Sequence, residues 1–137
     1  MSDDAFMTPE ERHAQVRSYL GKTVTIVIDR PVGYVHCKGE AALVYPINYG
    51  YIPGVLGGDG EELDVFLVGV DVPVSEFTGR IIGIAFRADD VEDKLIMVPE
   101  GMTLDAEEIA SAVQFQEKYY HTTICAIDGS EAEVERT

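Results

Sequence analysis

The sequence predicts a small α+β domain built on a closed or nearly closed antiparallel β-barrel with flanking helices. Short runs rich in β-branched and aromatic residues recur between turns that contain Gly or Pro, as is typical of strands. Two segments carry helix-start signals. A hydrophobic content of 46% in 137 residues is enough for one domain with its own core, and we expect residues 1–137 to form it. These patterns indicate the barrel but do not fix its topology.

The first element is expected to be a helix that runs to Tyr19. Thr8 can cap this helix, Pro9 suits its first turn, and Glu11 stands three residues after the cap. Expected strands follow at 23–29, 41–45, 64–70, 80–87, 94–98 and 121–127. The strands at 80–87 and 94–98 are expected to form a hairpin across the turn between them.

A second helix is expected over residues 103–120. Asp105 and Glu108 have the spacing of a capping pair, and apolar residues such as Ile109 and Val113 recur on one face. Residues 128–137 are polar and acidic, so we expect them to form a mobile tail.

The chain carries 25 acidic and 10 basic residues, which gives a formal net charge of −15. This charge repels phosphate backbones and anionic lipids, so it argues against nucleic-acid and membrane partners. It serves either solubility alone or the binding of divalent cations that screen an anionic substrate. No apolar run approaches the roughly 20 residues of a membrane span, and the acidic start is unlike a signal peptide. We therefore expect a cytoplasmic protein whose Cys37 and Cys125 are reduced thiols.

The segment that says most about chemistry is acidic and leads directly into an apolar strand. Asp59, Glu61, Glu62 and Asp64 place four carboxylates within six residues, after two glycines. Hard cations such as Mg²⁺ prefer oxygen ligands, and Mg²⁺ often bridges protein carboxylates to substrate phosphates. The alternative is an exposed acidic turn with no ligand.

Two further segments support a site for a cation and a phosphate. Residues 88–94 (ADDVEDK) form a second acidic turn, and two such loops in one small domain can converge on one metal. Residues 45–53 (YPINYGYIP) combine three tyrosines with an asparagine, whose hydroxyl and amide groups can donate to phosphate oxygens. The alternatives are a solvated loop for the first segment and aromatic core packing for the second.

Together these segments resemble the signature region of the soluble (family I) inorganic pyrophosphatases. Tyr45-Pro46-Ile47-Asn48-Tyr49-Gly50-Tyr51-Ile52 is followed by Asp59-Gly60-Glu61-Glu62-Leu63-Asp64-Val65, which is similar to the family's Asp-x-Asp-(Pro/Glu)-apolar-Asp-apolar loop. The resemblance extends from about Val24 to Tyr120. It implies a small OB-like barrel, hydrolysis of pyrophosphate to two phosphates with Mg²⁺ or another divalent cation, and a homo-oligomer.

The resemblance also implies roles for individual residues. The implied metal ligands are Asp59, Asp64, Asp89, Glu92 and Asp93, the last two as alternatives or together. The implied catalytic residues are Glu61, which helps to activate the attacking water, Asp64 and Lys94. The implied substrate-binding residues are Asn48, Tyr49 and Tyr119, with Arg30 and Lys38 as candidate cations.

The chain departs from the family pattern at several of these positions. Glu61 stands where the family has Asp, and the family's Lys-x-Glu pair on an early strand falls at Thr25-x-Val27. The lysine expected after the helix tyrosine is Tyr120. Arg30, His36 and Lys38 are all candidates for the missing early arginine, and spacing does not choose among them.

Three functions fit these observations. The first is a metal-dependent pyrophosphatase, the second a hydrolase of another small phosphoanhydride, and the third a non-catalytic module that binds metal or phosphate. In each case close carboxylates repel one another without their cation, so neutralising Asp59 or Asp64 is expected to stabilise the metal-free protein slightly.

Overall fold

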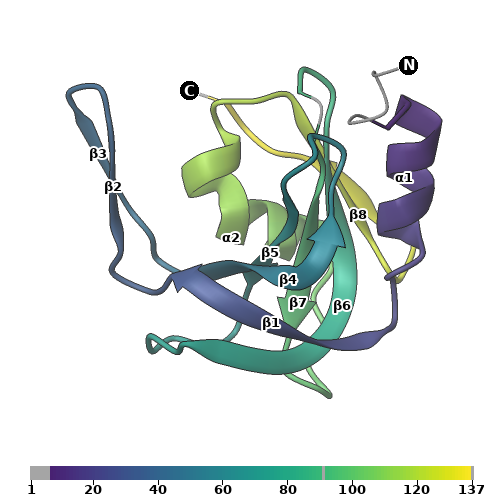
Figure 1. The fold of residues 1–137 in the computed structure, drawn as a ribbon, viewed down its shortest axis with the longest axis horizontal. Coiled ribbons are helices and arrows are strands. Elements are labelled where there is room, and N and C mark those ends of the chain that lie inside the picture. Colours follow the sequence, from purple (N-terminus) through teal and green to yellow (C-terminus); the bar gives the residue numbers. More distant parts are fainter. Residues whose placement is uncertain (1–6, 91, 137) are drawn as a thin grey trace.

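The computed structural model describes residues 7–90 and 92–136 and contains a β-barrel with two helices (Figure 1). The elements are α1 (Pro9–Arg17), β1 (Thr23–Arg30), β2 (Val35–Lys38), β3 (Ala41–Val44), β4 (Asn48–Leu56), β5 (Glu62–Leu67), β6 (Glu76–Arg87), β7 (Lys94–Val98), α2 (Ala106–Glu117), β8 (Thr122–Ala126) and β9 (Glu131–Glu133). Both helices begin with the capping boxes expected from the sequence, at Thr8 with Glu11 and at Asp105 with Glu108.

Five strands close the barrel in the order β1-β4-β5-β7-β6, and β6 pairs back with β1. This confirms the expected small α+β barrel. The barrel is mixed rather than antiparallel throughout, because β5 and β7 run parallel while the other neighbours are antiparallel. β6 lies between β5 and β7 in the sequence and runs opposite to both. The antiparallel pairing of β6 with β7 therefore leaves β7 parallel to β5.

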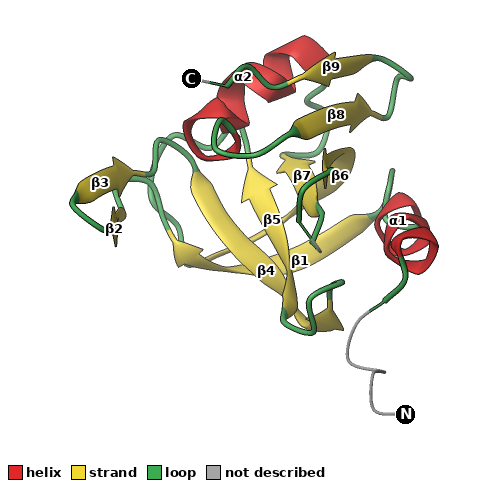
Figure 2. Ribbon diagram, turned by 90° about the horizontal axis from the view of Figure 1, so that it is seen from above, coloured by secondary structure: helices red, strands yellow, loops and turns green. Residues whose placement is uncertain are grey.

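Alternating side chains divide the barrel into an inner and an outer face. The inner face is filled by aliphatic residues such as Ile26, Val65 and Leu95, all fully buried. Their neighbours along the strands, including Phe66 and Ile96, point outward and pack against α2. Figure 2 shows α2 and the β8–β9 pair on one side of the barrel strands. The outer face of β4, β5 and β7 is therefore partly covered by α2, and its uncovered part can carry a site.

Most of the tyrosine segment, for which the sequence predicted no strand, belongs to the barrel strand β4. It passes so close to β1 that a Cβ on Gly50 would lie 1.8 Å from the carbonyl oxygen of Val27. Only glycine permits this approach, which explains an apparently loop-like residue in the middle of a strand.

Two other segments differ from expectation. The predicted strand at 41–45 forms β3, which in the described part of the chain pairs with β2 alone, in a hairpin that projects from the barrel (Figure 1). The predicted mobile tail instead contributes β9, and its Ala132 and Val134 are buried. Both apolar residues alternate with acidic ones, so an acidic composition concealed a half-buried strand. Neither helix in the described part of the chain is long and apolar enough to cross a membrane.

Candidate active site

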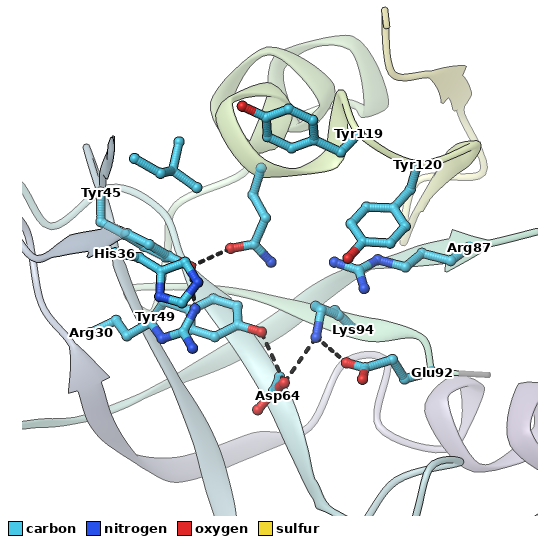
Figure 3. Close-up of a pocket in the computed structure, with 12 residues that line it drawn as sticks. Arg30, His36, Tyr45, Tyr49, Asp64, Arg87, Glu92, Lys94, Tyr119 and Tyr120 are labelled. Carbon is cyan, nitrogen blue, oxygen red and sulfur yellow. Dashed lines mark hydrogen bonds and ion pairs between the residues drawn. The ribbon is translucent and has the colours of Figure 1, made fainter. Parts of the chain in front are cut away.

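A cavity of about 240 Å³ opens on the outer face of the barrel, beside the C-terminal end of α2 (Figure 3). Its floor comes from β4, β5 and β7, and its walls come from the β2–β3 hairpin, the end of β6 and the turn after α2. The lining residues are Arg30, His36, Leu43, Tyr45, Tyr49, Asp64, Arg87, Glu92, Lys94, Gln116, Tyr119 and Tyr120.

Asp64 is the central acidic group of this cavity. The register of β5 against β7 places it beside Lys94 on the outer face, because their neighbours Val65 and Leu95 are paired. Lys94 Nζ and the Tyr49 hydroxyl each donate a hydrogen bond of 2.8 Å to Asp64 Oδ2. The Asp64 side chain keeps 30% of its surface exposed, so its carboxylate is oriented by two donors and still open to solvent.

Lys94 is a buried cation between two carboxylates. Its side chain is only 3% exposed, and its ammonium group contacts both Asp64 and Glu92. Burial alone would lower the pKa of Lys94, but the Tyr49 oxygen, Asp64 and Glu92 outweigh burial and raise it. Burial raises the pKa of Tyr49 as well. At neutral pH the site therefore contains a charged ammonium and a neutral hydroxyl.

Arg30 supplies a second positive charge on the other side of the cavity. Its guanidinium carbon lies 5.8, 5.5 and 5.7 Å from the ring centroids of Tyr34, Tyr45 and Tyr49. Arg30 NH1 donates to the Tyr45 hydroxyl at 2.6 Å, and that hydroxyl donates to Gln116 Oε1 at 2.6 Å. These contacts fix the guanidinium at the cavity wall, where it can meet an anion.

Six of the residues predicted from the sequence line this cavity: Arg30, Tyr49, Asp64, Glu92, Lys94 and Tyr119. His36, one candidate for the missing arginine, also lines it, whereas Thr25 bonds Thr78 and lies outside the lining. Lys38 belongs to β2, but its side chain is outside the described part of the structure. Among the candidates whose side chains the structure describes, Arg30 and His36 are the ones that line the cavity.

Two of the predicted site residues form hydrogen bonds with backbone groups outside the cavity. Asn48 is fully buried, accepts from the Val32 N–H and donates to the carbonyls of Val70 and Val72. Asp89 is exposed and accepts from the His121 N–H at 3.1 Å. Neither lines the cavity.

Three predicted carboxylates also lie away from the cavity lining. Asp93 is fully buried on the opposite face of its segment, where its Oδ2 accepts from Arg12 Nε at 3.0 Å. Asp59 Oδ1 accepts from the Glu61 N–H at 2.9 Å within the acidic turn, and the Glu61 side chain is exposed. The structure thus brings together Asp64 and Glu92 but not Asp59, Glu61 or Asp93.

The carboxylates of the cavity fit a divalent cation that completes its shell with water and substrate. Among the described residues, no three His, Cys, Asp or Glu side chains are grouped closely enough to form a complete metal cage. Asp64 and Glu92 already share one cation, the ammonium of Lys94. Mg²⁺ typically uses one or two carboxylates, several waters and substrate phosphates, which agrees with this donor set.

Five lining residues were given no role in the site from the sequence: Leu43, Tyr45, Arg87, Gln116 and Tyr120. Tyr45 belongs to the tyrosine segment but was not distinguished from core aromatics. Arg87 could have been identified from the sequence, because an arginine at the end of an apolar strand and directly before an acidic loop is expected to pair with a carboxylate. For Gln116 the sequence predicted only a position on the buried face of the helix and no role in a site.

Comparison with known proteins identifies the family to which the chain belongs. Residues 22–124 match the family model described as inorganic pyrophosphatase. An inorganic pyrophosphatase of Neisseria meningitidis serogroup A is 42% identical over 64 residues, which cover 43% of this chain and 36% of the relative. One from Aquifex pyrophilus is 30% identical over 97 residues, covering 66% and 55%. The chain therefore spans about a third to just over half the length of these relatives.

A solved structure shares the fold. The inorganic pyrophosphatase of Ehrlichia chaffeensis superposes with a TM-score of 0.57 over 84% of this chain and 88% of that chain. The sequence identity is 19%, so this likeness concerns the fold alone. The family match covers most of the chain from β1 to β8. The chain belongs to the inorganic pyrophosphatase family.

Proposed function

We propose that this chain hydrolyses pyrophosphate to two phosphates with the help of a divalent cation, Mg²⁺ in the first place. The observation that carries the proposal is Lys94, a buried ammonium between Asp64 and Glu92 in an open cavity. Arg30 lines the same cavity. The cavity thus offers carboxylates for a cation and cations for phosphate oxygens, which is the complementarity that a metal–pyrophosphate complex requires.

Asp64 and Glu92 are the proposed cation ligands. Tyr49 and Lys94 both donate to Asp64 Oδ2 and orient this carboxylate, which together with Glu92 would hold the cation. When bound, Mg²⁺ would neutralise substrate charge and lower the pKa of a coordinated water. The predicted roles of Asp59, Glu61, Asp89 and Asp93 stay predictions, because these residues lie outside the cavity lining.

Lys94, Arg30 and Tyr119 are the proposed phosphate-binding groups. Lys94 stabilises charge on the leaving phosphate, since its ammonium group lies in the cavity between the two proposed cation ligands. Arg30 binds the other end of the substrate, and Tyr119 donates a hydrogen bond without adding charge. Tyr49 already donates its one hydroxyl proton to Asp64, so it acts by orienting that carboxylate, and its role as a direct substrate ligand stays a prediction. Catalysis by these residues is therefore mostly positioning and electrostatic stabilisation.

The net charge of −15 fits a cytoplasmic enzyme that acts on a small metal-complexed anion. The same charge disfavours nucleic acid and anionic membranes as partners. A homo-oligomer stays a prediction from the family.

Phosphate release from pyrophosphate tests this function. We expect the purified chain to release phosphate with Mg²⁺ and to release none above the buffer rate after chelation, because the carboxylates need the cation to bind the substrate. The same assay on triphosphate and ADP identifies the preferred phosphoanhydride. If Mg²⁺, Mn²⁺, Co²⁺ and Zn²⁺ all fail to support release from pyrophosphate, the proposed function is wrong.

A further inference from the structure

A buried ion pair joins two walls of the cavity. Arg87, the last residue of β6, donates from Nε and NH2 to the two carboxylate oxygens of Glu117 at 2.9 and 2.7 Å. Arg87 NH1 donates to Asp90 Oδ2 at 3.0 Å. The side chains of Arg87 and Glu117 are 4% and 0% exposed. One guanidinium therefore connects the end of β6 to the end of α2 and to the acidic loop.

Other contacts reinforce the same junction. The ring of Tyr120 lies over the Arg87 guanidinium, with 3.7 Å between the ring centroid and the guanidinium carbon (Figure 3). The Thr122 hydroxyl donates to Glu117 Oε1 at 2.7 Å. The Ala88 N–H donates to the His121 carbonyl at 2.8 Å, so the loop and the turn after α2 are also bonded through their backbones.

Each connected segment carries residues that face the cavity. The turn after α2 carries Tyr119 and Tyr120, and the acidic loop leads to Glu92 and Lys94. Arg87 itself lines the cavity between these two groups. Burial alone would lower the pKa of Arg87, but its bonds to Glu117 raise it, so the guanidinium is a permanent charge at this place.

We propose that the Arg87–Glu117 pair is a positioning pair, which holds the Tyr119–Tyr120 turn and the loop that leads to Lys94 at the spacing that the substrate requires. The proposal rests on the proposed function for its kinetic consequence, but the mechanical link can be measured without it. A planar guanidinium meets three acceptors at fixed angles, whereas the ammonium of a lysine at this position could not. Charge alone is therefore insufficient for the role.

The test compares Arg87→Lys and Glu117→Gln with Val113→Ala. Val113 is fully buried in the core cluster, one turn of α2 before Glu117, and its apolar side chain supplies no donor or acceptor to the ion pair, so its truncation loosens the helix without removing a bond of the pair. Hydrogen exchange is measured in residues 88–90 and 118–122, and kcat and KM are measured with Mg²⁺ and pyrophosphate. Thermal melts show whether the variants lose comparable stability.

We expect Arg87→Lys to accelerate exchange in both segments together and to raise KM about tenfold, the loss of roughly one charge-assisted hydrogen bond, with a smaller change in kcat. Glu117→Gln should act in the same direction and serves as the test if Arg87→Lys does not fold. Val113→Ala should leave exchange in 88–90 and KM unchanged. Equal effects of Val113→Ala, or unchanged exchange in both ion-pair variants, would overturn the proposal. If the wild type hydrolyses no pyrophosphate, the exchange results alone decide whether the pair links the two walls.

Discussion

Replacing Asp64 by asparagine is expected to reduce Mg²⁺-dependent pyrophosphate hydrolysis on the order of 100- to 1,000-fold, the effect of losing one preorganised electrostatic group. The amide can still accept hydrogen bonds from Tyr49 and Lys94, but it has no charge with which to hold a cation. The measurement is kcat as a function of Mg²⁺ concentration. Asp71→Asn, an exposed change outside the cavity, is the control and should alter kcat by less than about twofold.

For the stability of the same variant, the structure and the sequence alone predict opposite changes. From sequence alone, neutralising Asp64 was expected to stabilise the metal-free protein by relieving repulsion. The structure instead pairs Asp64 with a buried ammonium, so Asp64→Asn should destabilise the metal-free protein by about 1–2 kcal/mol. A rise in the melting temperature of the metal-free variant would contradict this pairing.

Replacing Lys94 by methionine is expected to lower kcat by a similar factor, on the order of 100- to 1,000-fold, for a different reason. Methionine fills much of the space but supplies no charge to the leaving phosphate. It also removes the internal cation between Asp64 and Glu92, so half-maximal activation should occur at a lower Mg²⁺ concentration. Steady-state kinetics over a Mg²⁺ series measures both effects.

Lys22→Met is the matched control for Lys94, because Lys22 is exposed and lies outside the cavity. Its kinetic constants should stay within about twofold of the wild type. If Lys94→Met raises KM and leaves kcat unchanged, Lys94 binds the substrate without stabilising the transition state, and its proposed role is wrong.

Strand periodicity explains which site residues could be predicted from the sequence. Successive residues of a strand point to opposite faces, so Tyr49 faces the cavity while Asn48 is turned to backbone groups. Glu92 and Lys94, two residues apart where the chain enters β7, line the cavity, whereas Asp93 between them is turned towards Arg12. A sequence motif does not distinguish such neighbouring residues, whereas the alternation of side chains shows which of them face the cavity.

Other features depended on contacts that local patterns do not encode. An irregularity between Ile28 and Arg30 shifts the register of β1 and sets Arg30 opposite Tyr49. Arg87 reaches Glu117 across 30 residues of sequence, and β9 is recognisable only by its pairing with β8. The barrel was predictable from apolar runs, but the walls of its cavity come from long-range pairings.

Asp64 and Glu92 are proposed to hold a divalent cation beside Lys94 on the outer face of the barrel. Anomalous diffraction from crystals grown with Mn²⁺ and phosphate tests it most directly, because Mn²⁺ shares the oxygen-rich coordination of Mg²⁺ and can be located independently of the chain. We predict an anomalous peak in direct contact with an Asp64 oxygen and within reach of Glu92. A peak confined to the Asp59–Glu61 turn, or no peak in the cavity at a Mn²⁺ concentration that saturates activity, would contradict the claim.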